Sequence, residues 1–370
     1  MNRNSFLAVL SFLAATVMST ANASAAEKFD TDPKHQLPRP DGKPADMTKP
    51  VQVFILLGQS NMLGAGKIGP ADKDGSLEHA VKTKKLYPYL VDDAGNWTER
   101  KDVRNVRVMG SGTGAMKKFN NEWMTIKGNI GPEMGIGHHV GHVTDSPVLI
   151  LKSCIGNRSL GWDLLPPGSK GYEFDEKDKK TGVMKTFVYA GYKQSPMKWE
   201  KGTEPTPITW SAGMQYDGDI ANTKTVLAEL DAYYPGAKSY EIAGFFFWQG
   251  DKDRYDAGLA SHYEQNLVHL IGQLRKDFDA PNAKFVCATL GQSEKGVAEG
   301  NDGLILNAQL AVDGATGKYP QFKGNVATAY SHPLSMGGAS NSHYNGNAET
   351  YMNVGEAMGK AMVELLKNQK

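Results

Sequence analysis

The chain has 370 residues, with 41 Lys and Arg against 40 Asp and Glu, a formal net charge of +1, and two cysteines. No basic run exceeds three residues, so neither nucleic acid nor an anionic membrane surface is indicated as a partner. Two cysteines are too few for a disulfide scaffold, so stability must come from a hydrophobic core.

The first 25 residues have the features of a secretory signal peptide. Arg3 is followed by an apolar stretch over 6–18, and small residues then allow cleavage after Ala23 or Ala25. The apolar stretch is too short to span a bilayer, and no later one reaches ~18 residues. We therefore expect a secreted or periplasmic protein with a signal peptide (1–25), a proline-rich arm (26–50) and one domain (51–370).

Five largely apolar runs predict β-strands over 51–57, 103–109, 147–153, 243–248 and 284–290. Most are continuous rather than alternating, which is typical of strands covered on both faces of a parallel sheet. Helical spacing of apolar residues predicts helices over 131–144, 219–236, 261–278 and 350–370. This alternation predicts an α/β fold: a three-layer α/β/α sandwich with a five-stranded, mostly parallel sheet.

Residues 163–215 interrupt this alternation with polar, charged and aromatic side chains. A structureless loop of that length is uncommon inside a compact domain. Two interpretations are equally favoured: a hairpin insertion packed on its own aromatic residues, or a platform that binds the substrate.

The stretch "GQSNM" follows the first predicted strand and places Ser60 between polar and small residues. A serine at the carboxyl end of a central strand lies where open α/β sheets bind ligands. To act as a nucleophile it needs a base within hydrogen-bond reach and donors for the oxyanion. The structural alternative is that Ser60 caps a helix. Met62 occupies the place of the second glycine of the G-x-S-x-G elbow, so that motif is absent.

Three further stretches follow in order: "LKSCIGNRSLGW" (151–162), "FFFWQGDKD" (245–253) and "SHYNGNAETYMNVGEAMGKAM" (342–362). With "GQSNM", they resemble the SGNH hydrolases, specifically the branch of carbohydrate esterase family six and the sialate O-acetylesterases, which includes acetylxylan esterase-like proteins. The resemblance covers the chain from about residue 51 onward and is weakest over the 163–215 insert. It implies a flavodoxin-like SGNH fold and a serine esterase.

The resemblance also implies roles for individual residues. Ser60 would be the nucleophile and His343 the general base. The oxyanion would be bound by the backbone N–H groups of Ser60 and Gly156 and by the side-chain amide of Gln249. Neighbouring motif residues are expected to bind the substrate, with Asn157 also an alternative oxyanion donor: Gln59, Asn61, Asn157, Arg158, Trp162 and Trp248.

The catalytic acid departs from the family pattern D-x-x-H, because Ser340 stands three residues before His343. A main-chain carbonyl could hold the imidazole, which would give a Ser–His dyad, and this is the favoured interpretation. An acid from the third motif could act instead, with Asp251 preferred over Asp253. The remaining alternative is that catalysis has been lost.

Other histidines offer weaker alternatives. His332 is the rival general base, but it precedes Pro333 and lacks the following helix that His343 has. His138 and His142 have a zinc-binding spacing, without the Glu of an H-E-x-x-H motif. A packed or solvated helix face is the favoured interpretation of that pair.

The sequence thus predicts an exported serine esterase that removes O-acetyl groups from an oligo- or polysaccharide. The mechanism requires no metal or organic cofactor, and no nucleic-acid or membrane partner is expected. Two alternatives remain: an esterase for another small-acyl ester, since fold fixes chemistry better than substrate, and a carbohydrate-binding protein that keeps the fold without catalysis.

Overall fold

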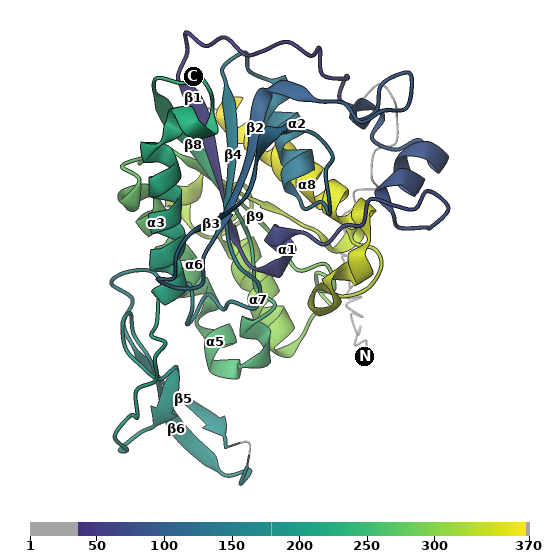
Figure 1. The fold of residues 1–370 in the computed structure, drawn as a ribbon. Coiled ribbons are helices and arrows are strands. Elements are labelled where there is room, and N and C mark those ends of the chain that lie inside the picture. Colours follow the sequence, from purple (N-terminus) through teal and green to yellow (C-terminus); the bar gives the residue numbers. More distant parts are fainter. Residues whose placement is uncertain (1–35, 179, 368–370) are drawn as a thin grey trace, which may run out of the picture.

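The computed structural model describes residues 36–178 and 180–367, so the expected signal peptide lies outside the described residues. Within these ranges a seven-stranded sheet forms the centre of the molecule, in the order β10-β9-β8-β1-β4-β2-β3 (Figure 1). Neighbouring strands are parallel, except that β3 runs antiparallel to β2. The strands are β1 (Val51–Gly58), β2 (Arg100–Met109), β3 (Lys117–Met124), β4 (Val148–Ser153), β8 (Tyr240–Trp248), β9 (Lys284–Ala288) and β10 (Val326–Ala329).

All five expected strands are present, but the expected sheet size was wrong, because β3 and β10 extend it to seven strands. β3 is a largely polar edge strand with several exposed positions. β10 has four residues, three of them Ala or Thr. Neither strand carries the apolar run by which the other five are recognised, since each lies at an edge of the sheet.

Helices cover both faces of the sheet, with α3 and α6 on one side and α2 and α8 on the other in Figure 1. The longer helices are α2 (Glu133–His142), α3 (Met214–Ala228), α6 (Tyr263–Asp277), α7 (Gly300–Ala311) and α8 (Ala348–Lys367). The short ones are α1 (Ser60–Leu63), α4 (Leu230–Tyr233) and α5 (Ala257–Ser261). Short segments of other helix types are η2 (His79–Thr83), η3 (Pro88–Leu90), η4 (Asp253–Tyr255), η5 (Pro320–Phe322), η6 (His332–Leu334) and the kinked η7 (Ser340–Gly346).

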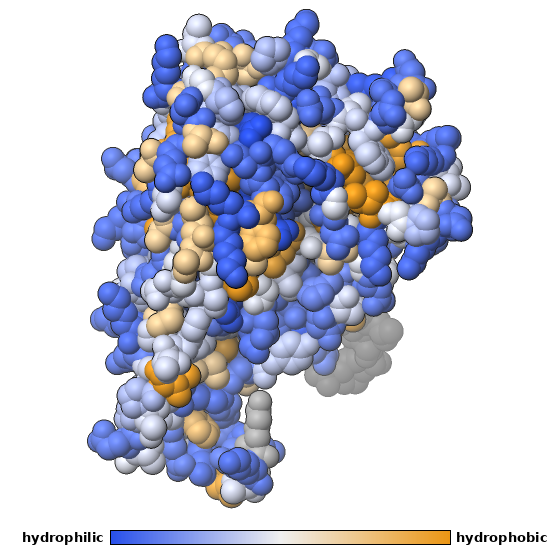
Figure 2. Space-filling model, in the orientation of Figure 1, coloured by the Kyte–Doolittle hydropathy of each residue, from blue (hydrophilic) through white to orange (hydrophobic). Residues whose placement is uncertain are grey.

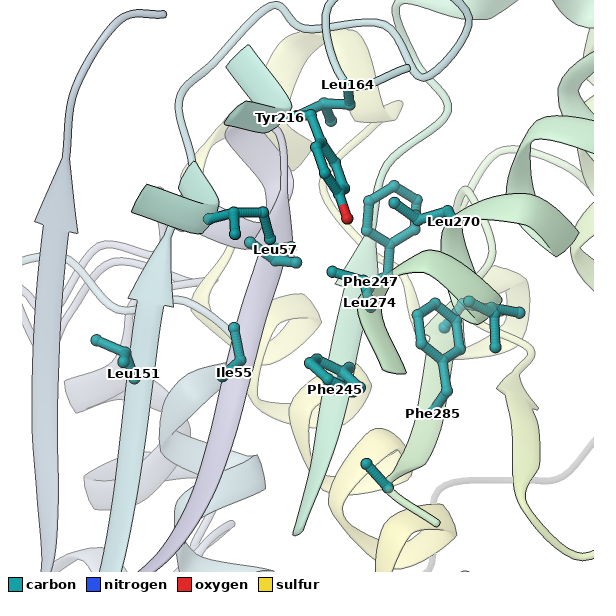
Figure 3. Close-up of a cluster of buried hydrophobic side chains, with 14 of the residues drawn as sticks. Ile55, Leu57, Leu151, Leu164, Tyr216, Phe245, Phe247, Leu270, Leu274 and Phe285 are labelled. Atoms are coloured by element: carbon teal, nitrogen blue, oxygen red, sulfur yellow. The ribbon is translucent and has the colours of Figure 1, made fainter. Parts of the chain in front are cut away.

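The apolar run of β1 is buried on both faces, since side chains alternate across a strand. Ile55 and Leu57 join the core cluster under α3 and α6, which Figure 3 shows with Phe245, Phe247 and Leu270. The intervening residues of β1, Phe54 and Leu56, join the second cluster, under α2 and α8. The central strand therefore holds both layers of the core together.

The insert forms its own antiparallel sheet, which projects from the domain beside α5 in Figure 1. Its strands are β5 (Tyr172–Lys177), β6 (Met184–Tyr189) and β7 (Lys198–Glu200). Tyr189 and Lys198 both donate to Asp256, at 2.6 and 2.7 Å, and the Tyr172 ring stacks on His262. A small cluster at its base contains Trp162, Leu165, Ala190 and Ala212, with Met197, Trp199 and Trp210 packed against it. These contacts favour the interpretation as a packed hairpin insertion.

The described part of the proline-rich arm, residues 36–50, has no helix or strand and lies along the domain. It is attached by the backbone N–H of Asp46, 2.8 Å from the Asp145 carbonyl, and by the Lys49–Asp145 ion pair. Hydrophilic residues dominate the face seen in Figure 2, with apolar ones in small scattered groups. Among the described helices none is long and apolar enough to cross a membrane.

Candidate active site

Three of the motif residues meet at one end of the sheet. Ser60 lies two residues after β1, Gly156 three residues after β4, and Gln249 directly after β8. β1 pairs in parallel with both β4 and β8, so these carboxyl ends are neighbours. The chain also builds one half of the sheet before β8 crosses to the other side of β1. Such a reversal of strand order is the usual ligand site of an open α/β sheet.

Ser60 opens the one-turn helix α1 at the end of β1. Gly58 precedes it with φ +143°, and a Cβ there would lie 2.4 Å from the carbonyl oxygen of Trp248, so only glycine fits. The helix ends at Gly64, with φ +91°. Gln59 occupies the N-cap position, so the alternative that Ser60 caps a helix is wrong. The sharp turn leaves Ser60 partly accessible above a buried strand.

The loop after β4 passes directly beside Ser60. A Cβ placed on Gly156 would lie 3.4 Å from the Cβ of Ser60. Asn157 follows in the left-handed region, with φ +58°, and turns the chain away. The two backbones expected to supply oxyanion donors are therefore neighbours, as a shared anion pocket requires.

Gln249 is fully buried, and both the nitrogen and the oxygen of its side-chain amide form hydrogen bonds. Its amide nitrogen lies 2.9 Å from the Arg158 carbonyl, 2.6 Å from Asp253 and 3.1 Å from the side-chain oxygen of Gln59. Tyr263 donates to its amide oxygen at 2.9 Å. Because an amide nitrogen has only two hydrogens, Gln249 would have to leave these partners to serve as the expected oxyanion donor.

Asp253 forms the other half of this buried network. It accepts hydrogen bonds from the backbone N–H groups of Leu160 and Gly161, at 2.9 and 2.8 Å. Burial raises the pKa of Asp253 to about 6, although the hydrogen bonds from Gln249 and the backbone oppose that shift. Gln249 and Asp253 together hold residues 158–161, the continuation of the loop that carries Gly156. The spacing of residues in the motif does not predict this positioning role of Asp253.

Ser340, which stands where the family pattern has its catalytic acid, contacts an acidic residue from another motif. Ser340 is 1% exposed and donates its hydroxyl hydrogen to Asp251 Oδ1 at 2.6 Å. Arg254 Nε donates to the same oxygen at 3.0 Å. Of the two acids considered from the sequence, Asp251 is therefore the one that reaches this position, and Asp253 is engaged with Gln249.

His343 lies in η7, which packs against α1, the helix of Ser60. Its backbone is left-handed, with φ +52° and ψ +40°, and its side chain is exposed. Over the described residues its ring makes no hydrogen bond, so the bond to Ser60 that a general base needs is not formed here. Catalytic hydrogen bonds of this kind are often long or poorly aligned in a free enzyme and tighten when the substrate binds.

His332 is placed differently. Its Nδ1 lies 2.8 Å from the Gly291 carbonyl, and its Nε2 lies 3.8 Å from Glu294. It follows β10, which is three strands away from β1, or about 14 Å at the usual strand spacing. The position of its segment therefore favours His343 as the general base.

Arg158 and Trp162 connect this loop to the insert. The Arg158 guanidinium lies 4.6 Å above the Trp210 ring and donates to Ser111 Oγ at 2.9 Å. Trp162 is largely buried in the cluster at the base of the insert. Arg158 thus links the loop after β4 to an aromatic side chain of the insert.

Of the other expected substrate-binding residues, Asn157 is exposed, whereas Gln59, Asn61 and Trp248 are buried. Trp248 has no exposed surface, and its indole N–H donates to the Thr289 carbonyl, so its assignment to the substrate was wrong. Gln59 accepts from Gln249 and from the backbone N–H of Lys252. Asn61 is fully buried, and neither of its amide atoms has a partner among the described residues.

The histidine pair on α2 does not form a metal site. His138 is buried and its ring lies 4.7 Å from that of Tyr89, whereas His142 is exposed. No cluster of three or more His, Cys, Asp or Glu side chains able to hold a metal occurs in residues 36–178 and 180–367. The packed or solvated helix face is thus the better interpretation.

Residues 193–364 match the family model described as "Carbohydrate esterase, sialic acid-specific acetylesterase". The matched range includes Gln249, Asp251, Ser340 and His343, whereas Ser60 and Gly156 precede it. The resemblance to the sialate O-acetylesterase branch, inferred above from four motifs, is confirmed.

Among solved structures, the chain is similar to a protein from Arabidopsis thaliana, with 17% identity, a TM-score of 0.46, and coverage of 85% of this chain and 98% of that one. A carbohydrate acetylesterase from Xanthomonas citri, XAC1771, gives 14% identity, a TM-score of 0.49 and coverage of 86% and 57%. The structure of NanS gives 13% identity, a TM-score of 0.38, and coverage of 78% of this chain and 79% of that one. A comparison with curated proteins gave no match.

Proposed function

We propose that this protein is an exported serine esterase that removes O-acetyl groups from a carbohydrate. The observation that carries the proposal is the contact between the turns of Ser60 and Gly156, next to the segment of His343. The match to a carbohydrate esterase family supports the class of substrate. The signal-peptide pattern of residues 1–25 supports export.

In the proposed reaction, the Ser60 hydroxyl oxygen attacks the ester carbonyl and its proton passes to His343. The resulting oxyanion accepts hydrogen bonds from the backbone N–H groups of Ser60 and Gly156. The tetrahedral intermediate then expels the sugar alcohol, which receives the proton from His343. Water, deprotonated by His343, attacks the acetyl-serine, and acetate leaves as Ser60 is restored.

We assign the orienting acid to Asp251, acting through Ser340. A hydroxyl has one hydrogen to donate, and Ser340 gives it to the Asp251 carboxylate. The oxygen lone pairs of Ser340 then remain available to accept a ring N–H of His343, three residues further on. Ser340 and Asp251 would then orient the His343 ring, as the aspartate of the D-x-x-H pattern would. We propose this arrangement in place of the Ser–His dyad in which a main-chain carbonyl holds the imidazole.

Hydrolysis of p-nitrophenyl acetate tests the chemistry, because this ester needs no sugar-binding site. Wild-type protein should release p-nitrophenol, and Ser60→Ala should lower the rate by orders of magnitude. Acetylated xylan and O-acetylated sialic acid, compared by acetate release, would then identify the preferred sugar. An inactive wild-type protein that still binds these sugars would instead support the carbohydrate-binding alternative.

A further inference from the structure

A buried ion pair lies directly behind the turn of Ser60. Lys152, on β4, and Glu133, in the first turn of α2, are joined at 2.5 Å, with side chains only 2% and 8% exposed. Burying two charges is costly, and an apolar pair of the same size is often as stable or more so. The pair therefore calls for a role that apolar side chains could not fill.

The ammonium group of Lys152 has a second partner, the carbonyl oxygen of Leu63, at 3.0 Å. Leu63 is the last residue of α1, the one-turn helix that Ser60 opens. A helix this short cannot hold itself together, and its final carbonyls have no partners within the helix. A cation at this end satisfies one of them and complements the helix dipole.

Glu133 fixes the other side of the same contact. Its second carboxylate oxygen accepts the backbone N–H of Gly131 at 2.9 Å. Gly131 in turn touches the end of α1, since a Cβ on Gly64 would lie 2.3 Å from the Gly131 Cα. Lys152 and Glu133 thus connect the end of the nucleophile turn to the start of α2 and to β4, the strand that leads to Gly156.

We propose that Lys152 and Glu133 form a positioning pair that fixes the Ser60 hydroxyl relative to the Gly156 backbone. This inference rests on the proposed esterase function. Neither side chain touches the substrate; the pair acts through the Leu63 carbonyl. Displacement of a reacting group by about 1 Å can cost about a hundredfold in rate. Loss of the pair should therefore lower kcat and leave KM nearly unchanged.

The test is the double variant Lys152→Met with Glu133→Gln, which removes both charges at similar volume. With p-nitrophenyl acetate, we expect kcat to fall about ten- to a hundredfold while KM stays within about twofold. Phosphorylation of Ser60 by diethyl p-nitrophenyl phosphate should slow by a similar factor. The matched control is Arg100→Met with Asp102→Asn, a largely buried ion pair whose Arg100 donates to the His138 carbonyl on α2. It should lower the melting temperature comparably without changing kcat.

A folded double variant with kcat within about threefold of wild type would overturn the proposal, as would an equal loss in the control. Glu133→Gln alone is the second variant if the double variant does not fold. This variant keeps the Lys152 bond to Leu63 but removes the charge of its partner, and we expect kcat to fall severalfold. An unchanged kcat in this variant would contradict the proposal. Inactivity of wild-type protein, or full activity of Ser60→Ala, would instead reject the esterase itself.

Discussion

Ser340 and Asp251, 89 positions apart in the sequence, are joined by a hydrogen bond of 2.6 Å between the Ser340 hydroxyl and the Asp251 carboxylate. The loop after β8 thus delivers an acid to the place where the family pattern has one. The departure from D-x-x-H is therefore compatible with an active enzyme.

Removing either partner of this bond should slow hydrolysis. We expect Asp251→Asn and Ser340→Ala each to lower kcat about ten- to a hundredfold, because His343 loses its orienting group. The exchange variant Asp251→Ser with Ser340→Asp should retain more activity than either single variant. Asp302→Asn, which removes the other carboxylate bound to Arg254, is the control and should leave kcat unchanged. An unchanged pH–rate profile in Asp251→Asn would exclude Asp251 as the acid.

Replacing the two candidate general bases, His343 and His332, should have very different effects on the rate of hydrolysis. His343→Ala should lower kcat/KM for p-nitrophenyl acetate by about a hundredfold or more, since a general base contributes about that much. His332→Ala should change it little, because its segment lies three strands from β1 and its ring is held by the Gly291 carbonyl. The reverse outcome would move the base to His332.

Gln249 should contribute strongly to stability. Replacing it by Leu removes one of the donors to the buried Asp253 and the side-chain donor to the Arg158 carbonyl, at a cost of about 1–3 kcal/mol in the free energy of unfolding. Urea unfolding of wild type and Gln249→Leu measures this loss. A variant of unchanged stability and greatly reduced kcat would indicate instead that Gln249 is the oxyanion donor expected from the sequence.

Acid should destabilise the protein through its buried histidines. Burial lowers the pKa of His139 from 6.5 to about 3, with the charges of Lys360 and His142 acting in the same direction. Because the folded-state pKa is the lower one, this contribution to stability is present above about pH 6.5 and is lost as the pH falls toward 3.

The measurement is the urea midpoint at about pH 7 and about pH 5. His139→Leu should lose less stability than wild type over this interval, whereas His142→Gln, which removes only the smallest of these causes, should lose nearly as much as wild type. Equal losses in all three proteins would contradict the assignment. His138, buried and with its pKa lowered in the same way, should account for part of the remaining loss.

The sequence predicted the interior of the fold better than its edges. Strands such as β1 and β9 are buried on both faces and therefore carry an apolar run. β3 is an edge strand with polar side chains, and β10 is a four-residue edge strand that pairs with β9. Pairing of backbones leaves no composition signal, so neither strand could be found from the sequence.

At the site, local motifs placed Ser60 and Gly156 at strand ends but said little about where side chains point. Trp248 and Gln249 are adjacent in one motif, yet Trp248 is packed in the core and Gln249 lies in the network under the loop. The Ser340–Asp251 bond joins two motifs whose separation has no fixed spacing. Only the folded chain brings those residues together.

The C-terminal helix α8 packs on α2, β9 and β10, and it supplies much of one core cluster. It follows every strand of the sheet in the chain. During synthesis, the part of this apolar face that α8 covers must therefore stay bare until residues 348–367 have emerged. A chain stalled before that point would be a natural client for chaperones.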